Sequence, residues 1–277
     1  MEVCDLHTHS VYSDGTCTPA ELLDQAEALG LSAIALTDHN TVAGLPEFLA
    51  AAEGRPVEAV AGIEFSTDYR GTELHMLGLF LKPSYFPQIT ALLAQYIREK
   101  EQSNRDLADA LNRAGYHFDY DALRDSTPNG QINRAHIAAE LTRRGYTGSV
   151  KEAFDRLLAV GQGFYTPPRR MSPFAAIEFI RSMGAAAVLA HPFLNLSEPA
   201  LREFLTQAVP LGLDGMEALY ATYTPETTRA ALAVAGDFGL KISGGSDFHG
   251  ENKPDIRLGV GRGNLAVPMD VCRALRP

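Results

Sequence analysis

Short apolar runs alternate with amphipathic stretches along most of the chain. The runs are continuous, as in strands buried on both faces of a parallel sheet, and they lie at 33–36, 57–63, 185–190 and 215–220. Between them, apolar residues recur at helical spacing, which predicts helices at about 18–30, 42–53, 173–183, 198–209 and 225–238. The first helix begins with a capping box at Thr18 and Glu21 and ends at Gly30. With further strands expected at 3–9, around 75–80 and at 241–243, the pattern is that of a βα series.

The middle of the chain has a different pattern. Between 83 and 168 the sequence predicts helices at about 85–114, 135–145 and 150–159, joined by polar turns such as 126–130, and it shows no obvious strand. Helix-rich sequence that interrupts a βα series predicts an inserted subdomain. We therefore expect a barrel domain made of 1–82 and 169–277, and a helical cap over the active site made of 83–168.

About seven strands, each with polar residues near its C-terminal end, predict an α/β fold with a closed or nearly closed parallel barrel. In such barrels the catalytic groups come from the C-terminal ends of different strands and meet at one mouth. An open doubly wound sheet is the alternative. It is less favoured because no glycine-rich dinucleotide loop follows the first strand and the chain has no P-loop.

Composition limits the possible partners and location. The formal net charge of −10 argues against holding duplex nucleic acid by neutralising its phosphates. Three cysteines without a Cys-x-x-Cys motif fit free thiols in a reducing compartment. The chain shows no basic leader before the first strand and no apolar run of about 18 residues that would cross a membrane. We expect a cytoplasmic protein without a membrane partner.

The first predicted strand carries candidate metal ligands. Side chains on a strand alternate between its faces, so His7 and His9 point the same way if 3–9 is extended. Two convergent imidazoles are half of a site for an ion such as Zn, Mn or Fe. Asp5 and Asp38 are candidates to orient ligating imidazoles from behind.

The histidines are concentrated at one kind of position. Six of the eight lie at or near predicted strand ends, where three carboxylates accompany them. Nine such groups are too many for one ion, so we expect two or three divalent metals. The imidazoles disfavour an all-magnesium site but do not distinguish Mn, Fe and Zn. The predicted ligands are His7, His9, Asp14, His39, Glu64, His75, His191, Asp247 and His249.

Seven motifs resemble, in order, those of the polymerase and histidinol phosphatase (PHP) family: Asp-Leu-His-Thr-His-Ser with Ser-Asp-Gly, Thr-Asp-His-Asn, Gly-Ile-Glu-Phe, Glu-Leu-His, Ala-His-Pro and Gly-Ser-Asp-Phe-His. The chain is most similar to the stand-alone phosphoesterases that remove phosphate from nucleotides, including 3′,5′-bisphosphates, and trim short oligoribonucleotides. The resemblance implies a distorted seven-stranded β/α barrel, a (β/α)7 barrel, with three metals. One metal would be held by His7, His9, Glu64 and Asp247. Glu64 would bridge to a second metal on His75 and His191, and the third would lie on Asp14, His39 and His249.

Substrate-binding residues are expected in the insertion. Asn133-Arg134-Ala135-His136 resembles the subgroup's Arg-x-His helix start, where arginine and histidine meet the substrate phosphate, although Asn133 stands where many relatives have glycine. Independently of the family, a guanidinium forks onto two phosphate oxygens, and a helix N-terminus adds donors. Arg169 and Arg170 are further candidates, for which a solvated pair is the commoner case. Aromatic residues are candidates to stack a base, although packing is their commoner use: Phe118, Tyr120, Phe164 and Tyr165.

The predicted reaction is hydrolysis of phosphomonoesters by a hydroxide that bridges two ions. Arg134 would offset charge on the phosphate oxygens, and His136 is a candidate to protonate the leaving alkoxide. The acidic surface favours mononucleotides, nucleoside bisphosphates or short oligoribonucleotides as substrates. Three alternatives remain: a histidinol-phosphate phosphatase, a C–N hydrolase of the wider barrel group, and a non-catalytic metal-binding module.

Overall fold

A computed structural model describes residues 2–127, 132–168 and 170–277. The chain divides into two compact units. The barrel unit comprises Met1–Ala91 and Arg170–Pro277, and the helical unit comprises Leu92–Arg169. The predicted polar turn at 126–130 lies mostly outside the described residues, as does Arg169.

The barrel unit contains one mixed sheet, and its described residues form eight strands where seven were predicted. In spatial order, β7 is followed by β6, β5, β4, β3, β2, β1 and β8. Parallel pairing joins β1 to β2 to β3 and β5 to β6 to β7, whereas β4 runs antiparallel to both neighbours and β8 antiparallel to β1. The strands are β1 (Val3–Asp5), β2 (Ala33–Leu36), β3 (Glu58–Tyr69), β4 (Thr72–Leu79), β5 (Ala186–Leu189), β6 (Gly215–Tyr220), β7 (Lys241–Gly245) and β8 (Val267–Pro268).

The sheet nearly closes between its first and seventh strands. The backbone N–H of Leu6 donates to the carbonyl of Gly244 at 3.2 Å, and that of Asp247 donates to the carbonyl of His7 at 2.9 Å. His9 lies beyond the end of β1 but keeps the same neighbour, because its N–H donates to Phe248 at 2.9 Å. The predicted α/β barrel is therefore confirmed, with β1 shorter than predicted and the chain still extended beside β7.

The expectation that every barrel strand is parallel was wrong, and the reason is a tight hairpin. Arg70 and Gly71 both have positive φ, at 55° and 85°, which is typical of a two-residue turn between antiparallel strands. As a result β3 does not end at Glu64 but continues to Tyr69. His75 then pairs with Ser66, two residues beyond Glu64, on the returning strand.

The barrel interior is apolar at one end and polar at the other. Val60 on β3 and Leu77 on β4 belong to an apolar cluster with β5, β8 and the C-terminal helix. Because strand side chains alternate, Glu64 shares the face of Val60 and His75 shares the face of Leu77. The strands that build the core therefore also carry polar groups to its far end.

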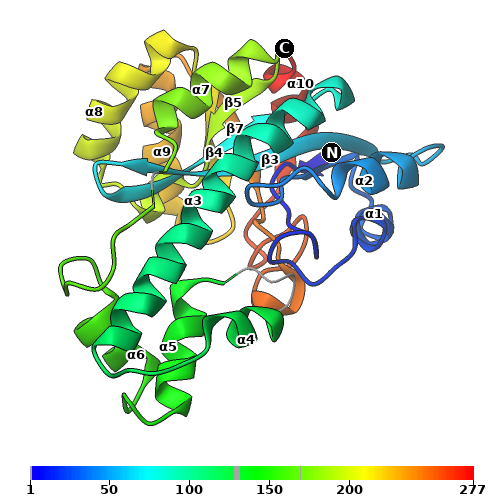
Figure 1. Ribbon diagram of the computed structural model, residues 1–277. Helices are drawn as coiled ribbons and strands as arrows, with labels where there is room; N and C mark the ends of the chain where they lie inside the picture. Colours follow the sequence, from blue (N-terminus) through cyan, green and yellow to red (C-terminus); the bar gives the residue numbers. More distant parts are fainter. Residues whose placement is uncertain (1, 128–131, 169) are drawn as a thin grey trace. The chain divides into compact units, whose positions relative to one another are not determined.

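Helices cover the outside of these strands (Figure 1). Helix α1 has Pro19 at its first position. The predicted capping box of Thr18 and Glu21 is present, with both of the hydrogen bonds that define it. The C-terminal helix α10 and strand β8 were not predicted. The barrel-unit helices are α1 (Pro19–Ala28), α2 (Leu45–Ala51), α7 (Pro173–Ser182), α8 (Glu198–Ala208), α9 (Pro225–Asp237) and α10 (Met269–Leu275).

The helical unit packs around its own apolar core. Leu107 and Leu111 of α3 meet Ile137 and Leu141 of α5 there. The long helix α3 begins in the barrel unit, and α4, which Asp119 caps, is too short for its periodicity to have predicted it. A π-helical turn at Phe154–Leu158 extends α6. The helices are α3 (Phe86–Arg113), α4 (Tyr120–Asp125), α5 (Arg134–Arg143) and α6 (Val150–Ala153). None of the helices in the described part of the chain has the length and hydropathy to cross a bilayer.

Candidate metal centre

Glu64 is buried on β3 and lies at the centre of the polar end of the barrel. Its Oε2 atom lies 3.2 Å from Nε2 of His7 and 3.3 Å from Nε2 of His9. The same oxygen is 3.0 Å from Nδ1 of His39, which follows β2. One carboxylate oxygen therefore faces imidazoles that two different strands supply.

The second oxygen of Glu64 faces two further imidazoles. Oε1 lies 2.8 Å from Nδ1 of His75 on β4 and 3.1 Å from Nε2 of His191 after β5. Glu64 thus contacts five of the six histidines predicted as ligands, and its two oxygens face different subsets of them. A carboxylate in this position has the arrangement of a bridge between two cations.

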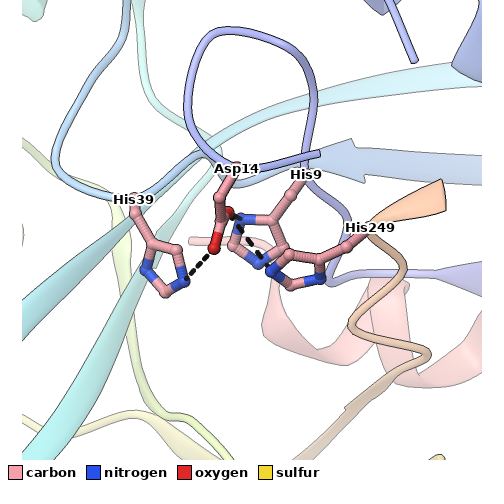
Figure 2. A group of neighbouring side chains, drawn as sticks. All are labelled: His9, Asp14, His39 and His249. Atoms are coloured by element: carbon pink, nitrogen blue, oxygen red, sulfur yellow. Dashed lines mark ion pairs between the residues drawn. The ribbon is translucent and has the colours of Figure 1, made fainter. Parts of the chain in front are cut away.

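Asp14 closes the other side of the cluster from the loop after β1. Its Oδ1 atom is 3.2 Å from Nε2 of His249, and its Oδ2 atom is 3.9 Å from Nε2 of His39. His9 and His249 stack beneath it with ring centroids 4.1 Å apart. Figure 2 shows the carboxylate of Asp14 reaching between the ring of His39 and the stacked pair.

Asp247 lies between the two groups. Its Oδ1 atom is 3.2 Å from Nε2 of His9 and 3.4 Å from Nδ1 of His249. Position 245, at the end of the strand before Asp247, requires glycine. A Cβ added to Gly245 would lie 2.4 Å from Cβ of His7. The nine predicted ligand residues are therefore brought together at one end of the barrel unit.

The carboxylates and imidazoles shift one another's pKa values. Burial opposes charge on Glu64, but the surrounding imidazoles outweigh it and hold its pKa well below the usual value. Burial likewise opposes charge on His7, yet the neighbouring carboxylates raise its pKa well above the usual value. Burial lowers the pKa of His39 to about 4, whereas two glutamates overcome burial and raise that of His75 to about 10. The carboxylates thus favour positive charge on His7 and His75, whereas burial prevails at His39.

Several buried atoms of the cluster have no hydrogen-bond partner among the described residues. They are Nε2 of His7, both ring nitrogens of His9, Nδ1 of His39, Oε2 of Glu64 and Nδ1 of His191. Each buried polar atom left unpaired costs about 1–3 kcal/mol. Three of the groups that can place donor atoms within 4.8 Å of one another are His7, His9 and Glu64; His39, Glu64 and His75; and His9, Asp14, His39 and His249. This donor set of nitrogen and oxygen fits divalent transition metals.

Two predicted orienting residues have other roles. Asp5 accepts the backbone N–H groups of Ser246 and Gly259 at 2.9 and 2.8 Å, which ties β1 to the C-terminal segment. Asp38 accepts hydrogen bonds from Ser10 and Ser13 at 2.7 Å each, which shapes the loop that carries Asp14. Neither carboxylate contacts an imidazole ring in the described part of the chain.

Three residues that were not predicted from the sequence also contact the cluster. Glu217 on β6 lies 3.0 Å from Nδ1 of His7, and Tyr220 donates its hydroxyl to Oδ2 of Asp247 at 2.7 Å. Lys253 forms an ion pair with the same oxygen at 2.7 Å. The available signal was a single glutamate inside the otherwise apolar run 215–220, where a charged residue requires a buried partner.

In the helical unit, Asn133 and His136 form a reciprocal cap at the start of α5. The side-chain oxygen of Asn133 accepts the N–H of His136 at 3.1 Å, and Nδ1 of His136 accepts the N–H of Asn133 at 3.1 Å. The guanidinium of Arg134 lies 4.3 Å from the ring centroid of Tyr165, and Nη1 donates to the carbonyl of Leu158 at 3.1 Å. Among the residues that the structure describes, no carboxylate pairs with Arg134.

The remaining candidates are distributed between packing and ion pairs. Phe118 and Tyr120 are buried in the core of the helical unit, and Phe164 packs against it. Arg170 pairs with Glu73 at 2.7 Å, and Glu73 lies 3.2 Å from Nε2 of His75. Arg170 is thus not merely solvated but is connected through Glu73 to a candidate ligand.

Comparisons with known proteins agree with this geometry. Residues 5–166 match the model of the PHP domain family. A 5′-3′ exoribonuclease of Haemophilus influenzae is 34% identical over 88% of this chain and 89% of its own length. A 3′,5′-nucleoside bisphosphate phosphatase of Chromobacterium violaceum is 30% identical over 92% of this chain and 91% of its own.

A solved structure from Bifidobacterium adolescentis, assigned as a metal-dependent phosphoesterase, superimposes with a TM-score of 0.73. It is 28% identical and covers 99% of this chain and 95% of its own. The family match spans more than half of the chain, and the H. influenzae relative matches nearly all of it. With the motifs in order and the histidine cluster assembled on a mixed barrel, this chain belongs to the PHP domain family.

Proposed function

We propose that this protein is a metal-dependent phosphoesterase that hydrolyses phosphate esters of nucleotides or short oligoribonucleotides. The proposal rests on the surroundings of Glu64, a buried carboxylate that faces five imidazoles. Several atoms of this group have no hydrogen-bond partner among the described residues. The relatives support the substrate class, since one is an exoribonuclease and another a nucleoside bisphosphate phosphatase.

The proposed ligands are the nine predicted residues. Glu64 would bridge two ions, one on the side of His7 and His9 and one on the side of His75 and His191. The contacts between Asp14, His39 and His249 support a third position. When bound, divalent ions lower the pKa of a coordinated water toward ~7 and offset negative charge on phosphate oxygens. Six imidazoles with three carboxylates suit Mn, Fe or Zn better than Mg alone.

Arg134 is proposed to bind the substrate phosphate. Its guanidinium is held by the ring of Tyr165 and by the carbonyl of Leu158, and no described carboxylate neutralises it. A guanidinium held in this way keeps N–H groups for a fork onto two phosphate oxygens. Arg143 on the same helix differs, because its guanidinium is paired with Glu140 at 2.7 Å.

His136 is proposed to contact the substrate through Nε2, as a hydrogen-bond donor. Its Nδ1 atom accepts the backbone N–H of Asn133, so in the neutral ring the proton resides on Nε2. Burial lowers the pKa of His136, which favours this neutral form at pH 7. In the neutral ring, Nε2–H suits a hydrogen bond to a phosphate oxygen. Protonation of the leaving alkoxide would require the imidazolium form, which the lowered pKa disfavours. Asn133 is proposed to support this role through the helix cap and to lie beside the substrate.

The wider setting of the proposal is a small substrate and a reducing compartment. A net charge of −10 disfavours duplex nucleic acid, whereas one or two phosphates are attracted by the local site. Cys4, Cys17 and Cys272 are unpaired, which supports a cytoplasmic location. That residues 83–168 act as a cap remains a prediction from the order of elements in the sequence.

The decisive experiment combines metal analysis with a phosphate-release screen on the purified chain. The substrates are nucleoside monophosphates, 3′,5′-bisphosphates, short RNA, sugar phosphates and histidinol phosphate, each with Mn, Fe or Zn. We expect two or three bound ions and release from nucleotide or RNA substrates. Preference for histidinol phosphate would replace the substrate class, and bound metal without release from any ester would indicate a non-catalytic module.

A further inference from the structure

Glu217 is a buried carboxylate on β6 that contacts two of the proposed ligands through different oxygens. Its Oε1 atom lies 3.0 Å from Nδ1 of His7, which follows β1. Its Oε2 atom accepts the backbone N–H of His191, which follows β5, at 2.7 Å. The side chain has no exposed surface, so its charge is stabilised only by such contacts.

The contact with His7 determines which ring nitrogen faces the cluster. A carboxylate accepts hydrogen bonds, so Nδ1 of His7 carries the proton that it donates to Glu217. The other nitrogen, Nε2, then has a free lone pair in the neutral ring. It lies 3.2 Å from Oε2 of Glu64 and 3.6 Å from Oδ1 of Asp247, inside the group of candidate ligands.

The contact with His191 holds a backbone conformation that the chain does not otherwise favour. His191 has φ of 28° and ψ of 51°, in the left-handed region, and Pro192 follows it. This region is unfavourable for a non-glycine residue, and a following proline favours the extended region instead. With its N–H fixed by Glu217, His191 places Nε2 3.1 Å from Oε1 of Glu64.

A bulge in β6 accompanies this arrangement. Glu217 is opposite Ser243 on β7, but Leu219 is opposite Gly244, so one extra residue is inserted between them. Bulges redirect the side chains on either side of them. Beyond the bulge, Tyr220 donates to Asp247, so β6 supports ligands on both sides of the irregularity.

We propose that Glu217 is a positioning residue that fixes the Nδ1-protonated tautomer of His7 and the backbone of His191, and so sets the metal affinity of the centre. The inference rests on the metal centre of the proposed function but not on its substrate. A carboxylate behind a ligating imidazole fixes the ring and increases its basicity, and its loss lowers metal affinity by about 10–100-fold.

A competing role is that Glu217 is itself a ligand, since it lies with His7 and His191 in a group whose donor atoms are within 4.8 Å of one another. Positioning explains the contacts better. Each oxygen of Glu217 already accepts a hydrogen bond, and its partner on His7 is the nitrogen that faces away from Glu64.

The test is metal binding by Glu217→Gln, with Ser243→Ala as the matched control. Ser243 is buried opposite Glu217, and its hydroxyl has no hydrogen-bond partner among the described residues, so its removal leaves the ligands untouched. Zinc affinity of the stripped proteins is measured by competition with a chromophoric chelator, and zinc content at saturation by elemental analysis. We expect Glu217→Gln to bind zinc about 10–100-fold more weakly with unchanged content at saturation, and Ser243→Ala to match the wild type.

Two outcomes would overturn the inference. Wild-type affinity in Glu217→Gln would show that the contact does not set binding, and one ion fewer at saturation would make Glu217 a ligand. If the wild type takes up zinc, manganese and iron not at all, the metal centre of the proposed function fails and the inference fails with it. If the wild type binds metal and only Glu217→Gln departs from the expected result, the metal centre stands and the positioning role of Glu217 fails.

A second measurement needs no variant at this position. In NMR spectra of the zinc-loaded protein labelled with ¹⁵N-histidine, we expect a slowly exchanging proton on Nδ1 of His7 and a zinc-shifted Nε2. A His7 ring protonated at Nε2 would contradict the positioning role even if Glu217→Gln does not fold.

Discussion

The metal cluster of the barrel unit and the start of α5 in the helical unit both contain histidine beside polar groups, but they satisfy those groups differently. At α5, Asn133 and His136 satisfy each other's backbone N–H within one helical turn. In the cluster, partners such as His7 and Glu217 are 210 residues apart, and several buried atoms have no hydrogen-bond partner among the described residues. A local cap is complete without a ligand, whereas the proposed cations would supply the partners that the buried atoms of the cluster lack.

The largest effect on metal content and activity is expected at Glu64, which lies at the centre of the cluster. Glu64→Gln replaces the buried anion, the proposed bridge, with an amide whose N–H₂ group faces imidazole nitrogens. We expect loss of bound metal and a fall in activity of about 10³-fold or more, equivalent to about 4 kcal/mol of transition-state stabilisation. Elemental analysis and phosphate release measure the two effects on the same sample.

Glu58→Gln is the matched control, because Glu58 begins the same strand and pairs with Arg276 at the surface. Such a pair contributes at most about 1 kcal/mol, so metal content and activity should be unchanged. Full metal content in Glu64→Gln would show that the buried carboxylate does not hold the ions.

Metal removal should have the next largest effect, on stability rather than on rate. Ions that bind only the folded chain stabilise it by about 2.7 kcal/mol when present at 100 times Kd. For a chain of this size that corresponds to a rise in Tm of about 5–10 °C. Calorimetry of the chelator-stripped chain with and without added zinc or manganese measures the shift.

The same titration on Glu64→Gln tests whether the stabilisation arises at the cluster. The shift should disappear there, since the buried atoms would no longer gain a shared cation. A rise in Tm of equal size in the variant would place the stabilising ion elsewhere in the chain.

Much of the barrel and the grouping of the candidate ligands could be predicted because period-two and helical patterns are local signals. The strand that ends at Leu36 could be predicted from its apolar run. The shared direction of His7 and His9 follows from the alternation of side chains along a strand, and their place at the barrel mouth follows from the common end of parallel strands. The direction of β4 was missed because it depends on the turn at Arg70 and Gly71, which a search for βα units passes over.

Glu217 shows why the support of the site was harder to predict than its ligands. A single glutamate in an apolar run does not state its partner, and His7 lies at the far end of the chain. Asp5 and Asp38 were nearer in sequence and were considered instead, yet they bind backbone and hydroxyl groups. Sequence proximity suggested the wrong carboxylates because closure of the barrel, not adjacency, brings Glu217 to His7.

In the helical unit, Arg134→Ala should weaken substrate binding without changing metal content. A charge-assisted hydrogen bond contributes about 1.5–3 kcal/mol, so KM should rise about 10–100-fold. Arg134→Lys keeps the charge but loses the fork and should recover only part of the loss. Steady-state kinetics and elemental analysis of both variants measure these effects.

Arg143→Ala is the control for Arg134, because Arg143 lies on the same helix, is exposed and pairs with Glu140. Its KM should match the wild type. Loss of metal in Arg134→Ala would remove the arginine from a substrate role, and an unchanged KM would leave it as a packing residue on Tyr165.

The smallest effect is expected at Asn133, where a capping role and a substrate role make different predictions. Its φ of −124° and ψ of 170° are extended, so the position accepts glycine without requiring it. As a helix cap, Asn133→Ala should cost about 1 kcal/mol and Asn133→Gly only a few tenths, measured by urea unfolding. Both variants keep the backbone N–H that donates to His136, so Nε2 of that ring stays protonated and KM should change little. If KM rose several-fold in Asn133→Gly while stability stayed near the wild type, the side chain would contact the substrate and not only the helix.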